Sequence, residues 1–316
     1  MYKVKVETKK QFDIVLSSDV VSDIILSRDS FGEKELVDLV CDIKKKDKKA
    51  FILMERISRY EEDDSFRLTT DRIYEIENID GIIIQNLDSY AYMLRKINKS
   101  ANSDLQVELN YTMDCYNVET KKVLTRLYNE KRINAKEVPL LFTAPVELNI
   151  YELNDVGYDT FLIYSYIDTM VSANCLYKNI IEPNKKNVAT NKSAEGVNAT
   201  NLLHCKYKFD FNHVNTYSSY ILDRKNKKLH YKTYCKYCYN KIFNTEPLYL
   251  IDKMDEIESI YSKGRKKEGL NEDNARLNTL KYRIDFSFEN EEEVKNILKG
   301  ICPESFTRGH FKTSIK

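Results

Sequence analysis

Two cysteines spaced three residues apart are the feature of this sequence best suited to chemistry. Cys235 and Cys238 form a C-x-x-C pair, and Cys175 and Cys205 are two further thiols in the same region. Thiolates with this spacing on a turn can face one metal, and two more complete a tetrahedral set. The spacing leaves open an iron-sulphur cluster, an irregular zinc site and four unrelated buried thiols. A thioredoxin-like redox pair is instead expected at the end of an early strand.

The remaining cysteines offer no such pattern. Cys41, Cys115 and Cys302 are isolated in sequence, so we assign them no role. His204 precedes Cys205 and is an alternative metal ligand. Seven cysteines is an odd number, which in a chain without a secretory signal favours thiols or metal ligands over disulfides.

The C-x-x-C pair lies within a basic, tyrosine-rich segment. Residues 224–241 carry seven lysines and arginines and no acidic residue. Basic side chains neutralise phosphates, and tyrosine rings stack on unpaired bases. The pattern predicts RNA contacts by Arg224, Lys227, Lys228, Lys232, Tyr234, Lys236 and Tyr237. A solvated hairpin in a lysine-rich protein explains it equally well.

The elements that must position these residues follow an α/β pattern. Short β-branched or aliphatic runs alternate with segments of helical period such as 34–46 and 89–97. The pattern predicts eight strands, at 3–6, 23–26, 50–54, 81–85, 106–109, 139–143, 160–165 and 283–288. This arrangement favours a TIM-like (β/α)8 barrel, although an open sheet has the same pattern.

The regular alternation is interrupted between the seventh and eighth strands by more than one hundred residues. We therefore expect a cysteine-bearing insertion there. Residues 1–165 are predicted to form the first seven β/α units, and 246–316 the final unit and a C-terminal tail. Between them, 166–245 would hold a mobile loop at 182–201 and a hairpin at 220–231.

A barrel of this kind carries its function at the carboxyl ends of its strands. Polar residues are expected there at Glu55, Arg56, Asn86, Asn110, Glu147, Asn149, Tyr166, Asp285 and Ser287. We take Glu147, Asn149 and Tyr166 as candidate catalytic residues, with the carboxylate suited to acid-base chemistry. Arg283 could bind a carboxylate or phosphate, but its position at the start of a strand favours the surface or the opposite end.

Composition excludes several classes of protein. Fifty basic against forty-nine acidic residues give a net charge of +1, which is uninformative about a polyanionic partner. Among only eight glycines, neither G-x-G-x-x-G nor G-x-x-x-x-G-K-[ST] occurs, and H-E-x-x-H and G-x-S-x-G are also absent. No apolar run is long enough to span a membrane, and the N-terminus lacks signal-peptide features. We expect a cytoplasmic protein.

Four blocks of the sequence resemble a known family. Residues 163–176 resemble the pattern V-Y-G-x-x-P-L-M-x-S-x-x-C, and 222–224 with 235–244 resemble L-x-D-R followed by C-x-x-C-x-N-x-I-x-N. Residues 307–311 resemble T-R-G-H-[FY], and 147–149 resemble E-L-[NS]. Together these blocks are similar to peptidase family U32, collagenase-like proteins associated with iron-sulphur-dependent hydroxylation.

The resemblance implies a barrel-type core with a 4Fe-4S cluster on Cys175, Cys205, Cys235 and Cys238. It implies hydroxylation of tRNA or ribosomal RNA, with prephenate as a co-substrate in the tRNA reaction, or a paired subunit in ubiquinone hydroxylation. The N-terminal part is closest to the second segment of the long family members, so a homologous protein partner is expected. The alternatives are a collagenase-like peptidase and a non-catalytic cluster-binding subunit.

The chain departs from the family pattern in two places. Ser165 and Asp168 stand where the family has glycine and proline, which changes the backbone options of the turn after the seventh strand. The stretch between Cys175 and Cys205 is also longer than the family usually has.

Overall fold

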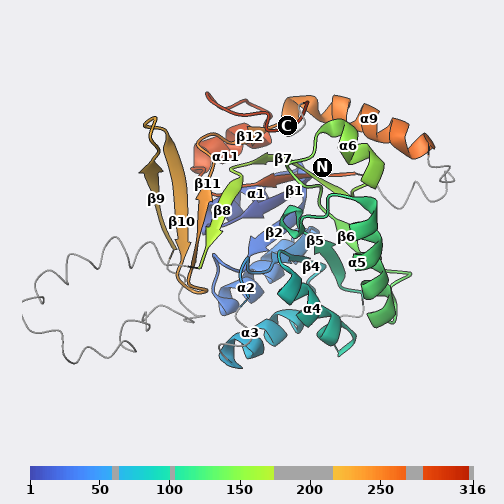
Figure 1. Ribbon diagram of the computed structural model, residues 1–316. Helices are drawn as coiled ribbons and strands as arrows, with labels where there is room; N and C mark the ends of the chain where they lie inside the picture. The colour runs from blue at the N-terminus through green and yellow to red at the C-terminus, as the bar shows by residue number, and fades with distance from the viewer. Residues whose placement is uncertain (59–63, 100–103, 174–215, 268–279, 313–316) are drawn as a thin grey trace, which may run out of the picture.

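The computed structural model describes residues 1–58, 64–99, 104–173, 216–267 and 280–312. A sheet of nine strands forms the centre of the molecule (Figure 1), in the order β12-β7-β13-β1-β2-β3-β4-β5-β6. Its parallel strands are β1 (Tyr2–Val6), β2 (Val21–Ser27), β3 (Lys49–Leu53), β4 (Gly81–Ile84), β5 (Gln106–Leu109), β6 (Leu141–Phe142), β7 (Thr160–Ser165) and β13 (Lys281–Asp285). The short β12 (Leu248–Tyr249) pairs antiparallel with β7.

Helices follow most of the parallel strands. They are α1 (Lys9–Leu16), α2 (Glu33–Lys44), α3 (Asp64–Tyr74), α4 (Leu87–Lys96), α5 (Val118–Lys131), α6 (Ile150–Val156), α9 (Met254–Lys267) and α11 (Glu291–Leu298). Three 3-10 turns are η1 (Ile97–Lys99), η2 (Tyr111–Met113) and η4 (Ile251–Lys253). None of these described helices has the length and apolar content that crossing a membrane requires.

Local sequence explains where the helices begin and which face they bury. Asparagine side chains at the N-cap accept hydrogen bonds from first-turn amides of α4, α5, α6 and α11, through Asn86, Asn117, Asn149 and Asn290. In α2, the apolar residues recur at helical spacing and are buried against the sheet: Leu36, Leu39, Val40 and Ile43.

The central sheet is strongly curled. Lys3 of β1 reaches Glu108 of β5, with Nζ 2.5 Å from Oε2, although three strands separate β1 from β5. In a flat sheet those strands would lie roughly 19 Å apart. The sheet must therefore bend until the inner side chains of distant strands meet.

The two faces of the curled sheet differ in chemistry. Successive residues of a strand point to opposite faces, and on β1 the valines Val4 and Val6 join the apolar core beneath the helices. Lys3 and Lys5 alternate with them and are buried on the inner face. That face also holds a small apolar cluster of Ile25, Phe51, Leu53 and Ile83. Burial of charge inside the curl makes ion pairing there obligatory.

A second sheet stands beside the carboxyl ends of the central strands (Figure 1). Its four antiparallel strands, in the order β8-β11-β10-β9, are β8 (Asp168–Ser172), β9 (Thr216–Leu222), β10 (Lys228–Tyr234) and β11 (Tyr239–Phe243). The β9–β10 turn is held by Asp223, whose Oδ1 accepts from the amides of Lys225 and Lys227 at 2.7 and 2.8 Å. The predicted hairpin at 220–231 is confirmed.

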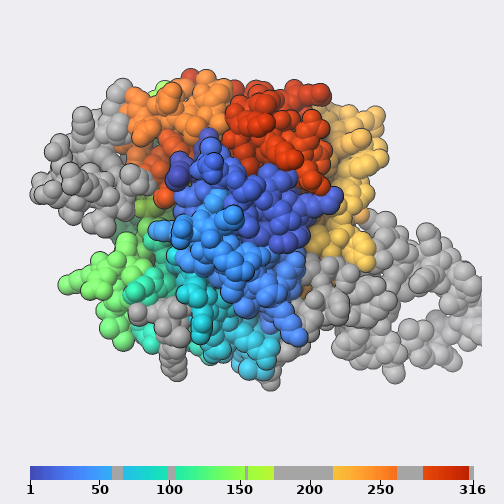
Figure 2. Space-filling view, turned by 180° about the vertical axis from the view of Figure 1, so that it is seen from behind, coloured from blue at the N-terminus to red at the C-terminus, as the bar shows by residue number. Residues whose placement is uncertain are grey.

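The two ends of the described chain pack together. Strand β13 pairs with β1, and α11 lies against α1, where the Gln11 side chain donates to the Glu289 carbonyl at 3.1 Å. Figure 2 shows the blue N-terminal surface adjoining the red surface of residues near the C-terminus.

The structure confirms the α/β class and all eight predicted strand positions to within a few residues. It has a curled, mostly parallel nine-stranded sheet with helices, so it agrees with the predicted architecture in its alternation of strands and helices and in the curvature of its sheet. The predicted loop at 182–201 lies outside the described residues. Strand β13 begins two residues earlier than predicted, so Arg283 lies in its middle.

Candidate functional site

Buried charged residues gather where the parallel strands end. Glu7 follows β1, Arg28 and Asp29 follow β2, and Glu55 lies two residues beyond β3. All four are at most 6% exposed. Since an unpaired charge is costly to bury, their partners decide what this site can do.

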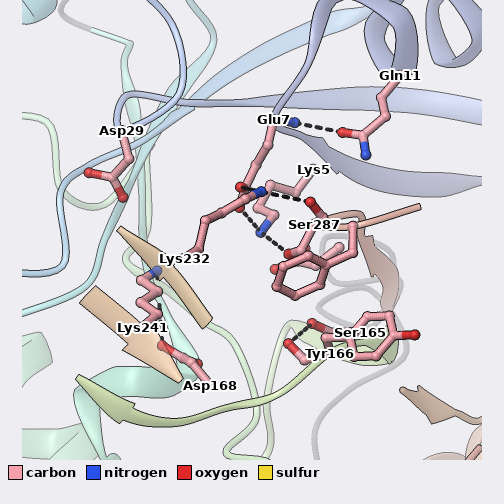
Figure 3. Close-up of polar contacts among 12 residues, drawn as sticks. Lys5, Glu7, Gln11, Asp29, Ser165, Tyr166, Asp168, Lys232, Lys241 and Ser287 are labelled. Atoms are coloured by element: carbon pink, nitrogen blue, oxygen red, sulfur yellow. Dashed lines mark hydrogen bonds and ion pairs between the residues drawn. The ribbon is translucent and has the colours of Figure 1, made fainter. Parts of the chain in front are cut away.

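The second sheet supplies some of those partners by reaching over the strand ends (Figure 3). Lys232 of β10 donates to Glu7 Oε2 at 2.6 Å and to the Ser287 carbonyl at 2.7 Å, while Lys5 donates to Glu7 Oε1 at 2.7 Å. Tyr234 adds a hydroxyl at 3.2 Å from Glu7. Burial alone would raise the pKa of Glu7, but the two lysines hold it well below its usual range. We call Lys5, Glu7 and Lys232 the clasp.

Asp29 is the carboxylate at this site that is most able to exchange a proton. The hydroxyl of Tyr239 on β11 donates to its Oδ2, and its Oδ1 has no hydrogen-bond partner among the described residues. Burial raises the pKa of Asp29 to about 6, against the opposing effect of Lys241. A carboxyl group with this pKa populates both protonation states near neutral pH, as a general acid or base must.

Lys236 lies between the two cysteines of the C-x-x-C pair and enters the same region. Its Nζ donates to the carbonyls of Arg28 and Phe31, both at 3.1 Å, in the loop after β2. Burial and the nearby Arg28 lower the pKa of Lys236 to about 7. Arg28 is itself buried, with Nη1 2.7 Å from Glu55 Oε2. The C-x-x-C turn is therefore anchored directly to the loop after β2 and, through Arg28, to Glu55 beyond β3.

Cys235 and Cys238 occupy the turn that joins β10 to β11. The Cys238 amide donates to the Cys235 carbonyl at 3.2 Å, and Cys238 has the left-handed φ of 55°. A turn closed in this way holds its first and fourth residues within about 7 Å of each other, as two ligands of one metal require. Cys235 is buried and Cys238 half-buried.

The other two predicted ligands, Cys175 and Cys205, and the alternative ligand His204, lie outside the described residues. Among the residues that are described, no three His, Cys, Asp or Glu side chains are grouped to hold a metal. Of the cysteines assigned no role, Cys41 and Cys302 are exposed and Cys115 is buried.

A further carboxylate, Asp168, lies where β8 begins. Tyr111 donates to its Oδ1 at 2.7 Å, and Lys241 of β11 lies 3.9 Å from its Oδ2 (Figure 3). Its side chain is only 4% exposed. Asp168 is thus part of the contact between the second sheet and the strand ends.

The three predicted catalytic residues are not brought together with this group. Glu147 is half-buried in the β6–α6 loop, where burial raises its pKa. Asn149 caps α6, accepting from the amides of Tyr151 and Glu152 at 2.9 and 3.1 Å, so its role is structural. Tyr166 packs against His230 of β10, nearer to the β9–β10 turn than the clasp.

The predicted RNA-contacting residues divide into two sets. Arg224, Lys227 and Lys228 are exposed at the β9–β10 turn. Lys232, Tyr234, Lys236 and Tyr237 are at most 7% exposed, because their side chains face the strand ends rather than solvent. The prediction of RNA contacts by these four is therefore corrected.

Arg283 also requires a correction. The sequence favours a surface position, but the guanidinium is fully buried inside the curl. It binds both oxygens of Asp285, at 2.6 and 2.8 Å, and donates to Asn110 at 2.8 Å. Three of its five N–H donors are thus engaged within the protein, and Asp285 already pairs with its charge.

Sequence reasoning missed Glu7 and Asp29, and it assigned Lys236 to RNA. Glu7 directly follows a predicted strand and Asp29 lies three residues past another, a signal that was available. The contact of Lys236 with the loop after β2 could not be found from sequence, because it depends on the three-dimensional docking of the β10–β11 turn.

The fold and this site define an α/β protein with a buried cluster of charged residues beneath a C-x-x-C turn. No protein-family model matches the chain, and no curated protein matches it. A solved structure described as that of an uncharacterized B. cereus protein is similar over part of the chain, with a TM-score of 0.34 and 12% sequence identity. The match covers 54% of this chain and 50% of that one, so it spans half of the length of the solved protein.

Proposed function

We propose that the curled sheet is a closed (β/α)8 barrel with an insertion after β7. Closure would join β6 to β7, and a parallel bridge between Thr143 and Thr160 supports it. The Ala144 amide donates to the Thr160 carbonyl at 2.9 Å, and the Asp159 amide to the Phe142 carbonyl at 2.9 Å. The cross-sheet contact of Arg283 with Asn110 supports the same curvature.

We propose, further, that this protein is a cytoplasmic relative of peptidase family U32 and that it binds a 4Fe-4S cluster. In this proposal it takes part in the hydroxylation of tRNA or ribosomal RNA, with prephenate as a candidate co-substrate. The observation that carries the proposal is the C-x-x-C turn, anchored by Lys236 to the carboxyl ends of the strands. That edge is where barrels of this class hold their active sites. Cys175 and Cys205 would complete the ligand set.

The described half of the donor set fits a cluster. Cys235 and Cys238 lie on one closed turn, as two ligands of one cluster require. When bound, a cluster would supply electron transfer or Lewis acidity. Asp29 and Lys236 would then move protons beside it, since burial brings their pKa values to about 6 and about 7.

Metal analysis tests the ligand assignment. Protein purified without air is expected to hold about four irons and four sulphides per chain, and Cys235→Ala to lose both. Cys302→Ala is the matched control, because Cys302 is an exposed cysteine far along the chain and its loss should leave the iron content unchanged. One zinc and no iron would reassign the cysteines to a structural clip, and neither metal would refute the assignment.

Exposed charge at the β9–β10 turn makes RNA the proposed substrate. Neutralising Arg224, Lys227 and Lys228 together by glutamine is expected to weaken tRNA binding at least about tenfold and to lower its salt dependence by about three counterions. The control neutralises Lys45, Lys46 and Lys49, which are exposed at the amino end of β3 on the opposite side. Equal losses of tRNA affinity in both triple variants would show that the β9–β10 turn contributes only non-specific electrostatic attraction.

Nucleoside analysis of a deletion strain tests the reaction itself. Loss of one hydroxylated nucleoside, restored by the wild-type gene and not by Asp29→Asn, is expected. If the purified protein holds a cluster but the deletion strain loses no hydroxylated nucleoside, the alternative of a non-catalytic cluster-binding subunit is favoured. Co-purification with a homologous partner would then test that alternative. Metal-free protein that cleaves gelatin would favour the peptidase alternative.

A further inference from the structure

A cavity of about 640 Å³ lies beside the second sheet, farther along β10 from the C-x-x-C turn than the clasp. It opens between the end of β7, strand β10 and helix α11. The side chains that bear on its chemistry are Tyr166, His230, Phe288, Glu289, Glu292 and Glu304. No sequence motif pointed to it, because these residues come from four separate parts of the chain.

The lining of this cavity is acidic. Glu289, Glu292, Glu293 and Glu304 contribute four carboxyl groups, and the lining contains no lysine or arginine. The single basic group is His230, whose pKa burial and the nearby Lys228 lower, so that its ring is neutral at pH 7. The Nζ of Lys232 lies 5.1 Å from the centroid of the Phe288 ring, but its charge is paired with Glu7 and it also donates to the Ser287 carbonyl. The field inside the cavity therefore favours a cation.

Three aromatic rings form one wall. Tyr166, His230 and Phe288 are in mutual contact, with ring centroids 5.5, 5.3 and 5.1 Å apart. Each ring is half-buried, so part of it faces the cavity. The faces of aromatic rings attract organic cations, and desolvation strengthens the attraction. Rings add little to the binding of a metal ion, which prefers oxygen ligands alone.

Glu289 gives the cavity a built, charged end. The side chain is 6% exposed, and its Oε2 accepts from the amides of Ser287 and Phe288 at 2.6 and 2.9 Å. Its Oε1 has no hydrogen-bond partner among the described residues. Burial raises the pKa of Glu289, and the hydroxyl of the adjacent Tyr164 offsets part of that effect. A buried carboxylate oxygen without a donor is costly, and a ligand N–H or a bound positive charge would offset that cost.

The N-terminus of α11 also faces this region, and its partial positive charge opposes a cation. Asn290 accepts hydrogen bonds from the amides of Glu292 and Glu293 and thereby satisfies two of the exposed donors. A helix terminus is equivalent to roughly half a positive charge. Four carboxyl groups outweigh it.

We propose that this cavity binds a small organic ammonium ion, with Glu289 as its counter-ion and the Tyr166, His230 and Phe288 rings as its wall. The site is separate from the C-x-x-C turn and does not depend on the metal assignment. The cavity lies beside the carboxyl ends of β7 and β13. A ligand there would not need to break the contacts between Lys5, Glu7 and Lys232 that form the clasp.

Titration of the full chain with choline and with 1,4-diaminobutane tests the proposal, with binding detected by calorimetry or by changes in amide chemical shifts. At least one is expected to bind saturably, and 3,3-dimethylbutan-1-ol, the uncharged isostere of choline, at least about tenfold more weakly. Glu289→Gln is expected to lower the affinity of the ammonium probe at least about tenfold, and Phe288→Leu about fivefold.

Exposed rim variants keep the test independent of folding. Glu292 and Glu304 are exposed, so Glu292→Gln/Glu304→Gln should melt like wild type and still weaken binding about two- to fivefold. The proposal would be overturned if neither ammonium probe bound saturably at concentrations up to about 10 mM, which is on the order of the weakest affinity such a site would show. Equal affinity for the uncharged isostere, or wild-type affinity in both Glu289→Gln and the rim variant, would overturn it as well.

Discussion

Glu108→Gln is expected to lower the free energy of unfolding by about 3–5 kcal/mol, because it leaves Lys3 buried without its counter-ion. Both side chains are at most 2% exposed, and Glu108 also accepts from Thr143 Oγ1 at 2.6 Å. Burial lowers the pKa of Lys3, and Glu108 offsets part of that effect. Denaturant unfolding of wild type and variant at pH 7 measures the difference.

The same variant makes a signed prediction about pH. Without Glu108, the folded-state pKa of Lys3 falls further below its unfolded value of about 10.4. The penalty of burying the charged ammonium is complete below the folded pKa and disappears as pH rises toward the unfolded one. The stability lost in Glu108→Gln should therefore be smaller at pH 10 than at pH 7.

An exposed pair provides the matched control. Lys122 and Glu119 lie 2.8 Å apart with side chains 66% and 79% exposed, so Glu119→Gln should change stability by less than about 0.5 kcal/mol. Replacing both buried partners, as Lys3→Met/Glu108→Leu, should recover most of the loss. If Glu108→Gln behaved like Glu119→Gln, the sheet would not be curled tightly enough to bring β1 and β5 together.

The order of strands was predictable because it depends on local patterns. The run 81–84 is short and apolar, and 106–109 alternates polar with apolar residues. A helical segment follows each of them in the sequence. Alternation between strand and helix then requires parallel pairing. The degree of curl was not predictable, since it depends on contacts such as that of Lys3 with Glu108 across 105 residues.

The candidate site was predictable in its location but not in its members. Glu55 and Asp285 follow from strand ends, as does the importance of the C-x-x-C turn. The orientation of the hairpin decides the rest: on strand β10, Lys228 is exposed while Lys232 is buried, and both read alike as basic residues in a sequence. Composition cannot distinguish a lysine that contacts a phosphate from one that pairs with a buried glutamate.

Lys232→Met distinguishes these two roles in the absence of any RNA. The clasp loses its 2.6 Å contact with Glu7, which keeps the cation of Lys5 and the Tyr234 hydroxyl, so we expect a loss of about 2–3 kcal/mol in the free energy of unfolding. Cleavage by trypsin at the β9–β10 turn should also become faster, because the second sheet is less firmly docked. The control is Lys228→Met on the same strand, whose exposed side chain should contribute less than about 0.5 kcal/mol.

Acid titration gives the clasp a second, independent signature. The folded pKa of Glu7 is below its unfolded value, so its contribution to stability is complete above about pH 4.3 and is lost as pH falls through the folded pKa. Without Lys232, burial is opposed only by Lys5, the folded pKa rises, and the loss begins at a higher pH. Acid unfolding of Lys232→Met should therefore begin about one pH unit above that of wild type. If Lys232 instead served RNA alone, both lysine variants would match wild type in stability and acid unfolding and would differ from it only in RNA affinity.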